Sequence, residues 1–190
     1  MSLGDSQIEK YRYLINNYIK SNFLDNIEHE ELKKMSEYAL FNGKRLRSCI
    51  VADITFNILK KPLLDVALAV ELLHNASLVL DDLPTMDNDS FRRGSYTIHK
   101  LFGEKKAKVL AFFFLTEANK IFISREDCSK EIIIENLELM RAASLGQYFD
   151  LSGEEPTLKT SPFFTTSFLS AYLFSNSAKD NIEKVKLLST

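Results

Sequence analysis

The chain has 190 residues, of which 45% are hydrophobic and 26% are charged, and its formal net charge is -2. This is enough for one domain with a full core, and we expect residues 1–190 to form a single domain. The near-neutral charge gives no reason to expect a nucleic acid partner, and no run of about 18 apolar residues is present that could span a bilayer. Two cysteines, Cys49 and Cys128, are too few for a disulfide framework, so we expect a reducing compartment, the cytoplasm.

Helical periodicity dominates the sequence. Apolar residues in the segment 8–19 recur at steps of three and four, which predicts an amphipathic first helix. A second helix is expected over 30–41, where Asn42 and Gly43 end it in the usual C-terminal manner. Further helical candidates follow at 64–83, 106–122, 132–151, 163–176 and 182–188. Strand-like alternation is not sustained anywhere, and Gly and Pro are scarce, with 6 and 4 residues, so the pattern predicts an all-α helical bundle with short connections.

Residues 64–83, LDVALAVELLHNASLVLDDL, form a largely apolar run that ends near two adjacent aspartates. A helix that is apolar on nearly all sides lies inside a bundle, so we expect this segment to be the central helix. At about 100° per residue, His74, Ser77 and Asp81 fall along one face of that helix.

The segment 81–94, DDLPTMDNDSFRRG, gathers four aspartates and then two arginines. Pro84 disfavours helical geometry at Leu83, so we expect the chain to bend there and to bring Asp87 back towards Asp81. Two carboxylates held close together are costly unless a cation neutralises them. Oxygen-only ligands suit Mg²⁺, which completes its shell with water and substrate phosphate, so the segment is a candidate magnesium site.

Basic residues accompany this acidic segment. Arg92 and Arg93 are planar, bidentate donors that suit phosphate oxygens, and a second basic cluster, GKRLR, lies upstream at 43–47. Carboxylates for a metal and two basic clusters for phosphate, around an apolar helix, suggest a substrate with a diphosphate head and a hydrocarbon body. Each feature alone also has an ordinary explanation: a solvated turn for the aspartates, a solvated helix start for GKRLR and a core position for His74.

Three stretches of the chain resemble the trans-isoprenyl diphosphate synthases, also called polyprenyl synthetases. They are FNGKRLRS, ELLHNASLVLDDLPTMDNDSFRRGSYTIHKLFGE and SLGQYFDLSGEEPTLKTSPFF, and the resemblance covers most of the chain. DDLPTMD followed by RRG is similar to the first aspartate-rich motif of that family in its longer-spaced form. The resemblance implies an isoprenoid-synthase-like helical bundle around a central apolar cavity.

The resemblance also implies roles on the allylic side of the site. Asp81 and Asp87 would be ligands of Mg²⁺ that bridges the allylic diphosphate, and Asp82 would help to build this site. Arg92 would contact the same diphosphate. The catalytic set implied in this way is Asp81, Asp82, Asp87, Arg92 and Lys159, and Gln147 joins Lys159 in binding the allylic substrate.

Isopentenyl diphosphate is the second substrate that the resemblance implies, and Lys44, Arg47, His74 and Arg93 would hold its diphosphate. The reaction would ionise an allylic diphosphate, add it to the isopentenyl double bond and release a proton, which gives a farnesyl or geranylgeranyl diphosphate of C15–C20. The resemblance further implies a homodimer. The alternative from another class is a non-catalytic regulatory or structural subunit of such a synthase. A terpene cyclase is a more distant alternative, because a cyclase has no need of an isopentenyl diphosphate site.

Two departures from the family pattern matter. The second aspartate-rich motif, FQxxDDxxD, would follow residue 190, so we expect the 190-residue chain to lack the C-terminal helices of the bundle and to have little condensation activity by itself. The segment 109–115 reads VLAFFFL where the family usually reads VLAGDAL, which places Phe112 and Phe113 at a Gly-Asp pair.

Product length depends, by this resemblance, on a channel beside the helix over 64–83. Ala76 lies five residues before Asp81, where farnesyl-forming relatives commonly carry an aromatic floor. A small side chain there predicts extension beyond C15, to C20, unless the bulk of Phe112 and Phe113 restores the floor.

Overall fold

Helices form almost all of the regular structure in the described part of the chain. The computed structural model describes residues 3–41, 43–152, 167, 169–172 and 174–175. In chain order, the elements are α1 (Leu3–Asn22), the 3-10 turn η1 (Leu24–Asn26), α2 (Glu30–Phe41), α3 (Leu46–Leu59), α4 (Leu64–Asp81), β1 (Phe91–Arg92), β2 (Ser95–Tyr96), α5 (Ile98–Phe102), α6 (Glu104–Ile123) and α7 (Lys130–Ser152). The predicted all-α fold is therefore confirmed. None of the described helices is long and apolar enough to cross a membrane.

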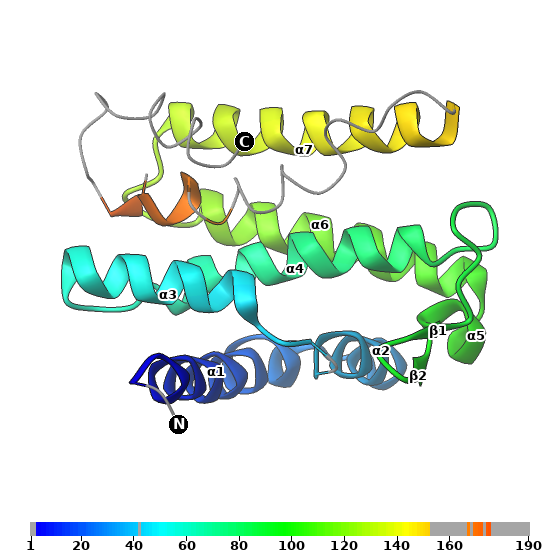
Figure 1. Cartoon of the computed structure of the whole chain (residues 1–190), viewed down its shortest axis with the longest axis horizontal. Helices are drawn as coiled ribbons and strands as arrows, with labels where there is room; N and C mark the ends of the chain where they lie inside the picture. The colour runs from blue at the N-terminus through cyan, green and yellow to red at the C-terminus, as the bar shows by residue number, and fades with distance from the viewer. Residues whose placement is uncertain (1–2, 42, 153–166, 168, 173, 176–190) are drawn as a thin grey trace.

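Helix α4 is the centre of the bundle. Every residue over 66–76 is buried, and the helix packs most extensively against α6 while also contacting α1, α2 and α3. Figure 1 shows α1 and α2 on one side of α4 and α7 on the opposite side. Because neighbours cover α4 in several directions, apolar residues occupy nearly its whole circumference, as its sequence predicts.

A short hairpin follows α4. Strands β1 and β2 pair antiparallel through a two-residue turn at Arg93 and Gly94, whose φ angles are 52° and 81°. Two positive φ values in succession match the backbone twist of a tight hairpin. The hydroxyl of Tyr38 in α2 donates a hydrogen bond to the carbonyl oxygen of Tyr96 at 2.8 Å. The hairpin is thereby tied to α2.

Among the described elements, the 3-10 turn η1, helix α3, the hairpin and α5 were not predicted from the sequence pattern. Helix α3 reads LRSCIVADITFNIL, which has no clear apolar stripe and includes several β-branched residues. Its packing against α1 and α4 stabilises it despite this weak local preference. The hairpin strands have two residues each, too short for any alternation. Of the predicted C-terminal helices, 182–188 and most of 163–176 lie outside the described residues.

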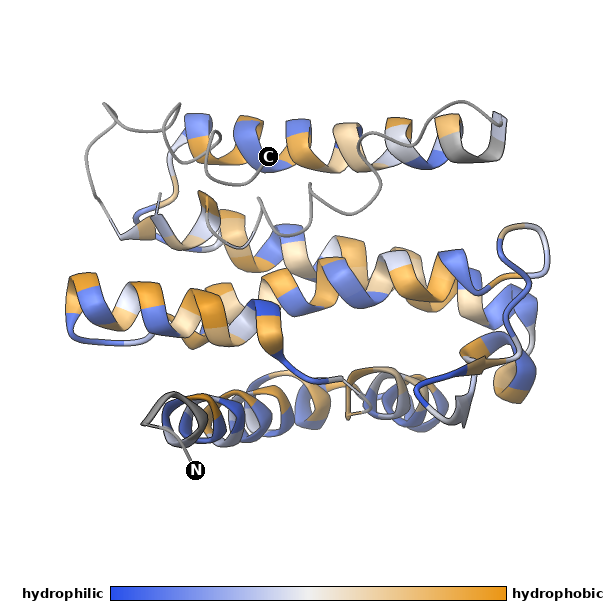
Figure 2. Cartoon of the chain, in the orientation of Figure 1, coloured by the Kyte–Doolittle hydropathy of each residue, from blue (hydrophilic) through white to orange (hydrophobic). Residues whose placement is uncertain are grey.

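Two polar connections lie near the central helix. Figure 2 shows hydrophilic colour on the turn that leads into α3 and on the loop and hairpin after α4. A Cβ atom added to Gly43, in the first of these connections, would lie 3.0 Å from Nη1 of Arg93 in the second. The two polar connections, about 50 residues apart in the chain, therefore meet in space beside α4.

Candidate active site

The loop after α4 folds back on the end of that helix. The backbone N–H of Asp87 donates to the carbonyl oxygen of Asp81 at 2.9 Å, and the N–H of Asn88 donates to that of Leu83 at 3.0 Å. Asp81 is half-buried and Asp87 is exposed. The bend expected at Pro84 is confirmed, and it brings both candidate metal ligands to the C-terminal end of α4.

The chemistry of this pair fits Mg²⁺. Asp81 and Asp87 are both carboxylates, and magnesium typically takes one or two carboxylates while water and phosphate oxygens complete its shell. Within the residues that the structure describes, no group of three or more His, Cys, Asp or Glu side chains could hold a metal ion. The two aspartates would therefore leave most of the coordination shell to water and to a phosphate ligand.

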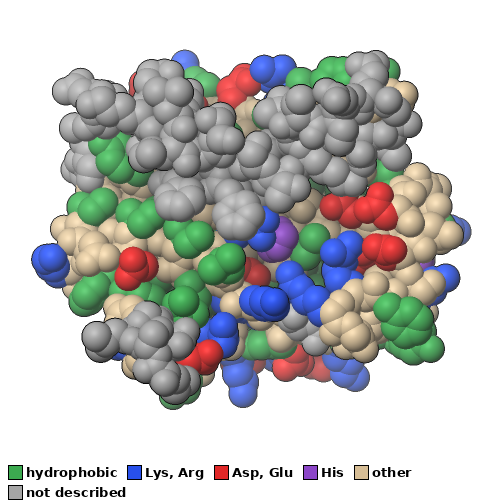
Figure 3. Space-filling view, in the orientation of Figure 1, with side chains coloured by type: hydrophobic (Ala, Val, Ile, Leu, Met, Phe, Trp, Pro, Cys, Tyr) green, Lys and Arg blue, Asp and Glu red, His purple; other side chains and the backbone are tan. Residues whose placement is uncertain are grey.

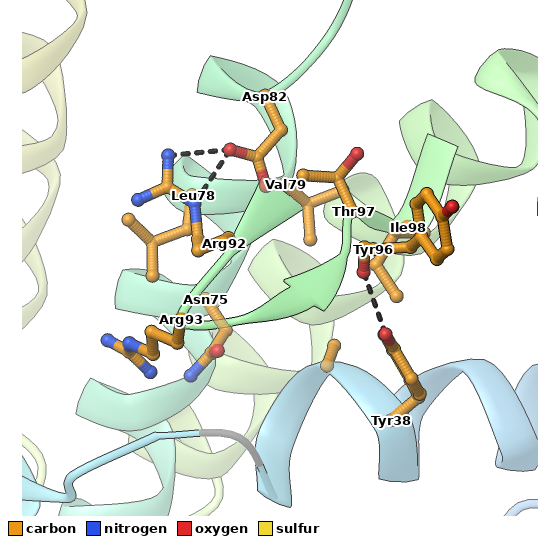
Figure 4. A pocket seen from close by; sticks show the side chains of 11 residues that line it. Tyr38, Asn75, Leu78, Val79, Asp82, Arg92, Arg93, Tyr96, Thr97 and Ile98 are labelled. Atoms are coloured by element: carbon orange, nitrogen blue, oxygen red, sulfur yellow. Dashed lines mark hydrogen bonds and ion pairs between the residues drawn. The ribbon is translucent and has the colours of Figure 1, made fainter. Parts of the chain in front are cut away.

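Asp82 has a different environment, because its side chain is directed into the protein and is only 6% exposed. Its Oδ1 accepts a hydrogen bond from Nε of Arg92 at 2.6 Å and forms an ion pair with Nη2 at 2.5 Å, as Figure 4 shows. Burial raises the pKa of Asp82 although Arg92 opposes this shift. Burial alone would lower the pKa of Arg92, but the hydrogen bond and charge of Asp82 raise it overall. Asp82 thus holds the Arg92 guanidinium in place at the end of α4.

Arg93 lies at the turn of the hairpin, beside Asn75 of α4 (Figure 4). Arg92, Arg93 and Asn75 all line one small cavity of about 40 Å³. Since the turn at Gly43 also approaches Arg93, both basic segments predicted from the sequence converge on α4.

Arg47 of α3 contacts His74 of α4, with Nη1 of the arginine 3.0 Å from Nε2 of the histidine. Burial, and then the charge of Arg47, lower the pKa of His74 to about 4, so the ring is neutral at neutral pH. Arginine can only donate, so Nε2 is the acceptor in this contact. Burial also lowers the pKa of Arg47, and Lys44 is exposed just before α3. Figure 3 shows Lys and Arg side chains gathered around a histidine on this face, with Asp and Glu beside them.

A cavity of about 370 Å³ lies between α4, α6 and α7. Leu80 of α4, Leu115 of α6 and Met140 of α7 contribute apolar wall, and Asp81 and Gln147 line the same cavity. Nε2 of Gln147 is buried and has no hydrogen-bond partner among the described residues, which leaves it able to donate to a ligand. One candidate metal ligand and one amide donor therefore face a single, largely apolar space.

The positions expected to set the depth of this space do not line it. Ala76 is fully buried in the core, whereas its neighbour Ser77 lines the cavity. Phe112 is 73% exposed, and Phe113 stacks on Phe23 with ring centroids 5.9 Å apart. For the cavity as the described residues bound it, the space expected beside a small Ala76 and the floor that Phe112 and Phe113 could restore are not part of the lining, because helix packing turns these side chains elsewhere.

Two charged residues of this region were not singled out from the sequence. Arg45 and Glu71 form a buried ion pair of 2.9 Å between the turn before α3 and the middle of α4. The available signal was a carboxylate in the centre of an apolar helix. Arg45 was hidden within GKRLR, whose basic residues were all candidates for phosphate binding. Lys159, a predicted catalytic residue, lies outside the described residues.

The described residues thus form a helical bundle in which a carboxylate pair, two basic segments and an apolar cavity lie around α4. A family model described as polyprenyl synthetase matches residues 29–185. The chain therefore belongs to the polyprenyl synthetase family, as its motifs predicted.

Individual relatives agree with this assignment. A farnesyl diphosphate synthase of Geobacillus stearothermophilus is 35% identical over 153 residues, which cover 74% of this chain and 52% of the relative. A geranylgeranyl diphosphate synthase of Pantoea ananas is 34% identical, with 74% of this chain and 50% of the relative covered. The chain thus spans about half the length of these relatives. The crystal structure of a geranyltranstransferase from Thermotoga maritima, 26% identical, has a TM-score of 0.82 over 96% of this chain and 72% of that chain. These names give no support to the alternative of a non-catalytic subunit.

Proposed function

We propose that the protein is a prenyltransferase that condenses isopentenyl diphosphate with geranyl or farnesyl diphosphate to give a polyprenyl diphosphate of C15–C20. The observation that carries this proposal is the position of Asp81, which belongs to the candidate metal pair and also lines the cavity of about 370 Å³. A diphosphate bound at this pair would have its hydrocarbon tail beside the apolar wall of this cavity. The names of the two curated relatives support the same chemistry.

On the allylic side, Asp81 and Asp87 would hold Mg²⁺, which supplies neutralising charge for the departing diphosphate when it is bound. Arg92 donates to the same diphosphate, whose negative charge grows as the carbon–oxygen bond breaks. Asp82 keeps the Arg92 guanidinium oriented for this contact through a hydrogen bond to Nε and an ion pair with Nη2. The other proposed ligands on this side are Gln147 and Lys159.

On the isopentenyl side, the cations of Lys44, Arg47 and Arg93 would bind the second diphosphate. His74 adds no charge at neutral pH, because burial lowers its pKa to about 4. Its Nε2 accepts a hydrogen bond from Arg47 and so orients the guanidinium for contact with phosphate oxygens.

The apolar wall has a chemical role in this proposal. Leu80, Leu115 and Met140 line the cavity next to Asp81, so they exclude water from the space beside the reacting allylic carbon. Exclusion of water allows the isopentenyl double bond, rather than a water molecule, to capture the electron-deficient carbon. Ser77, a small residue in the same wall, leaves room for a tail beyond C15, which supports a product of C20.

The proposal includes a homodimer and a cytoplasmic location. On α6, Val109, Phe112 and Ile123 fall within about 60° of one another around the helix and are 64%, 73% and 57% exposed. Lys105 and Thr116 share this sector. A second copy packed on this mostly apolar stripe would remove its three apolar side chains from water. Cys49 and Cys128 are free thiols, which suits a reducing compartment.

The activity is tested by incubating the protein, as its gene encodes it, with isopentenyl diphosphate and one allylic diphosphate. Three allylic diphosphates are compared: dimethylallyl, geranyl and farnesyl diphosphate. Chromatography of the dephosphorylated products should show chain elongation to C15–C20 that requires Mg²⁺ and stops on addition of a chelator. Absence of any elongated product, in protein that is shown by circular dichroism to be folded, would contradict the proposed activity.

A further inference from the structure

The ion pair between Arg45 and Glu71 is part of a buried polar network that joins three helices. The side chains of the two residues are 1% and 3% exposed. Ser48 of α3 donates its hydroxyl to Oε2 of Glu71 at 2.6 Å, and Asn75 of α4 donates Nδ2 to Oε1 at 3.1 Å. Arg45 donates Nε to Oδ1 of Asn16 in α1 at 2.9 Å. The network therefore links α1, the start of α3 and the middle of α4.

Stability alone does not account for such a network. Removing two charges from water costs about as much as their attraction returns, so a buried ion pair adds little net stability compared with a packed apolar pair. Arg45 also has the left-handed backbone conformation, with φ of 59°, which a residue with a side chain adopts only at a cost. The ion pair thus holds a turn that the backbone by itself disfavours.

This turn carries the basic residues of the proposed isopentenyl site. Lys44 precedes Arg45 and Arg47 follows it at the start of α3, so the conformation of Arg45 sets the direction in which both side chains leave. Glu71 lies one helical turn before His74 on α4, and Nε2 of His74 accepts a hydrogen bond from Nη1 of Arg47 at 3.0 Å.

The hairpin approaches the same point. A Cβ atom added to Gly43 would lie 2.6 Å from Nη1 of Arg45, 3.0 Å from Nη1 of Arg93 and 3.2 Å from Oε1 of Glu71. Three charged groups from three segments of the chain therefore surround one glycine, and the only carboxylate among these three groups is that of Glu71. The negative charge of Glu71 also favours the charged form of Arg47, against its burial.

We propose that Glu71 is a positioning residue: by pairing with Arg45 it fixes the turn that presents Lys44 and Arg47 to the diphosphate of isopentenyl diphosphate. This inference rests on the proposed function and adds to it a residue that makes no contact with substrate itself. Glu71 acts on binding only through the geometry of the turn, because its own charge repels a diphosphate.

The direction in which Glu71→Gln changes the affinity for isopentenyl diphosphate distinguishes a positioning role from a direct electrostatic effect. Glu71→Gln keeps the size of the side chain and an oxygen that accepts from Ser48, but it removes the charge that holds Arg45. Loss of a negative charge near three arginines would by itself tighten the binding of a diphosphate. Loss of positioning weakens it instead, by about 10- to 100-fold when one charge-assisted hydrogen bond to the diphosphate is lost.

The dissociation constant of isopentenyl diphosphate, measured by isothermal titration calorimetry, tests the positioning role. We expect Glu71→Gln to weaken isopentenyl diphosphate by about tenfold or more, and geranyl thiodiphosphate with Mg²⁺ by no more than about twofold. Asp65→Asn is the matched control, since Asp65 is also an α4 carboxylate paired with an arginine, Arg125, and lines a different cavity. It should leave both dissociation constants unchanged.

A double variant tests the same role in a stable protein if Glu71→Gln alone folds poorly. Arg45→Met combined with Glu71→Gln removes the unpaired buried charge, so it should recover the thermal stability of the wild type while still binding isopentenyl diphosphate about tenfold more weakly. Wild-type affinity in this double variant, or unchanged or tighter binding in folded Glu71→Gln, overturns the positioning role. Failure of the wild-type protein to bind isopentenyl diphosphate at all would instead overturn the proposed function.

Discussion

The charged side chains of the site differ in how deeply the protein buries them. Asp82 is almost fully buried and accepts from Arg92, and His74 is buried and accepts from Arg47. Asp81 is half-buried on the cavity, and Asp87 is exposed. Adjacent residues of similar chemistry therefore have different roles, which only their surroundings reveal.

Asp81→Asn should abolish Mg²⁺-dependent turnover and leave the fold intact. The substitution removes one of two metal carboxylates, and loss of one charge in a cluster of aspartates relieves repulsion in the metal-free protein. We expect the rate to fall by about 100-fold or more, with an unfolding midpoint in urea equal to or above that of the wild type.

Asp89→Asn is the control, because Asp89 belongs to the same segment but is half exposed and only 3.6 Å from Arg92 in a surface ion pair. Its turnover should stay near the wild-type value. Near-normal Mg²⁺-dependent turnover in Asp81→Asn would remove Asp81 from the metal site.

His74 makes the folded protein sensitive to mild acid. Burial and Arg47 lower its pKa from 6.5 to about 4, so between these values the unfolded chain binds a proton that the folded chain does not. The contribution of His74 to the free energy of unfolding is therefore fully present above its pKa in the unfolded chain. It is lost as the pH falls towards the pKa in the folded chain, by roughly 2 kcal/mol between about pH 7.5 and about pH 5.

Urea unfolding at these two pH values measures the effect. His74→Gln, which cannot bind the proton, should lose less stability over the same interval by roughly that amount. An equal loss in the wild type and in His74→Gln would show that other groups cause the acid sensitivity.

At the scale of helices, sequence periodicity predicted the elements whose apolar residues form a stripe or a continuous run. The expected segments at 30–41, 64–83 and 132–151 correspond closely to α2, α4 and α7. Helix α3 was missed because its β-branched, mostly apolar sequence favours no single period, and only its packing between α1 and α4 makes it helical.

The candidate site was predictable only in part for a related reason. The bend at Pro84 follows from local geometry and could be predicted, as could the chemistry of Asp81 and Asp87. The orientation of Ala76 could not, since whether a residue of a buried helix faces a cavity or the core depends on the neighbouring helices. The pairing of Arg45 with Glu71 joins residues 26 positions apart, and no local pattern encodes it.

A larger side chain should therefore have different effects on product length and stability at Ser77 and at its neighbour Ala76. Ser77→Phe places a ring in the cavity wall and should shorten the product towards C15 with a small effect on stability. Ala76→Phe forces a ring into a site that is 0% exposed, so it should destabilise the protein by about 1–3 kcal/mol.

Product chromatography and thermal unfolding of both variants test this difference. A shortened product from Ala76→Phe at wild-type stability, with an unchanged product from Ser77→Phe, would mean that the growing chain follows a different path.

At the scale of the whole molecule, the bundle brings residues from distant parts of the chain to the two sides of α4. The turn at 43–45 and the hairpin bring cations to one side, and α6 and α7 form the cavity on another. Helix α4 thus separates a polar, cationic region from an apolar one, and Asp81 at its end borders the apolar side. This arrangement suits a substrate with a charged head and a hydrocarbon tail.

The outer face of α6 gives a prediction about assembly. Phe112 is 73% exposed in a mostly apolar stripe, so Phe112→Asp should abolish a homodimer formed through that face. Size-exclusion chromatography with light scattering should give a dimer mass for the wild type and a monomer mass for the variant. Tyr13→Asp, at a 68% exposed position on α1, should remain a dimer. A dimer in both variants would place the interface elsewhere.

A crystal structure of the protein with Mn²⁺ and geranyl thiodiphosphate, an allylic analogue that resists ionisation, tests the proposed site most directly. We expect an anomalous peak at the carboxylates of Asp81 and Asp87, with the diphosphate at Arg92 and the geranyl tail beside Leu115 and Met140. Manganese bound away from both aspartates, or a tail lying outside the cavity between α4, α6 and α7, would contradict the proposed site.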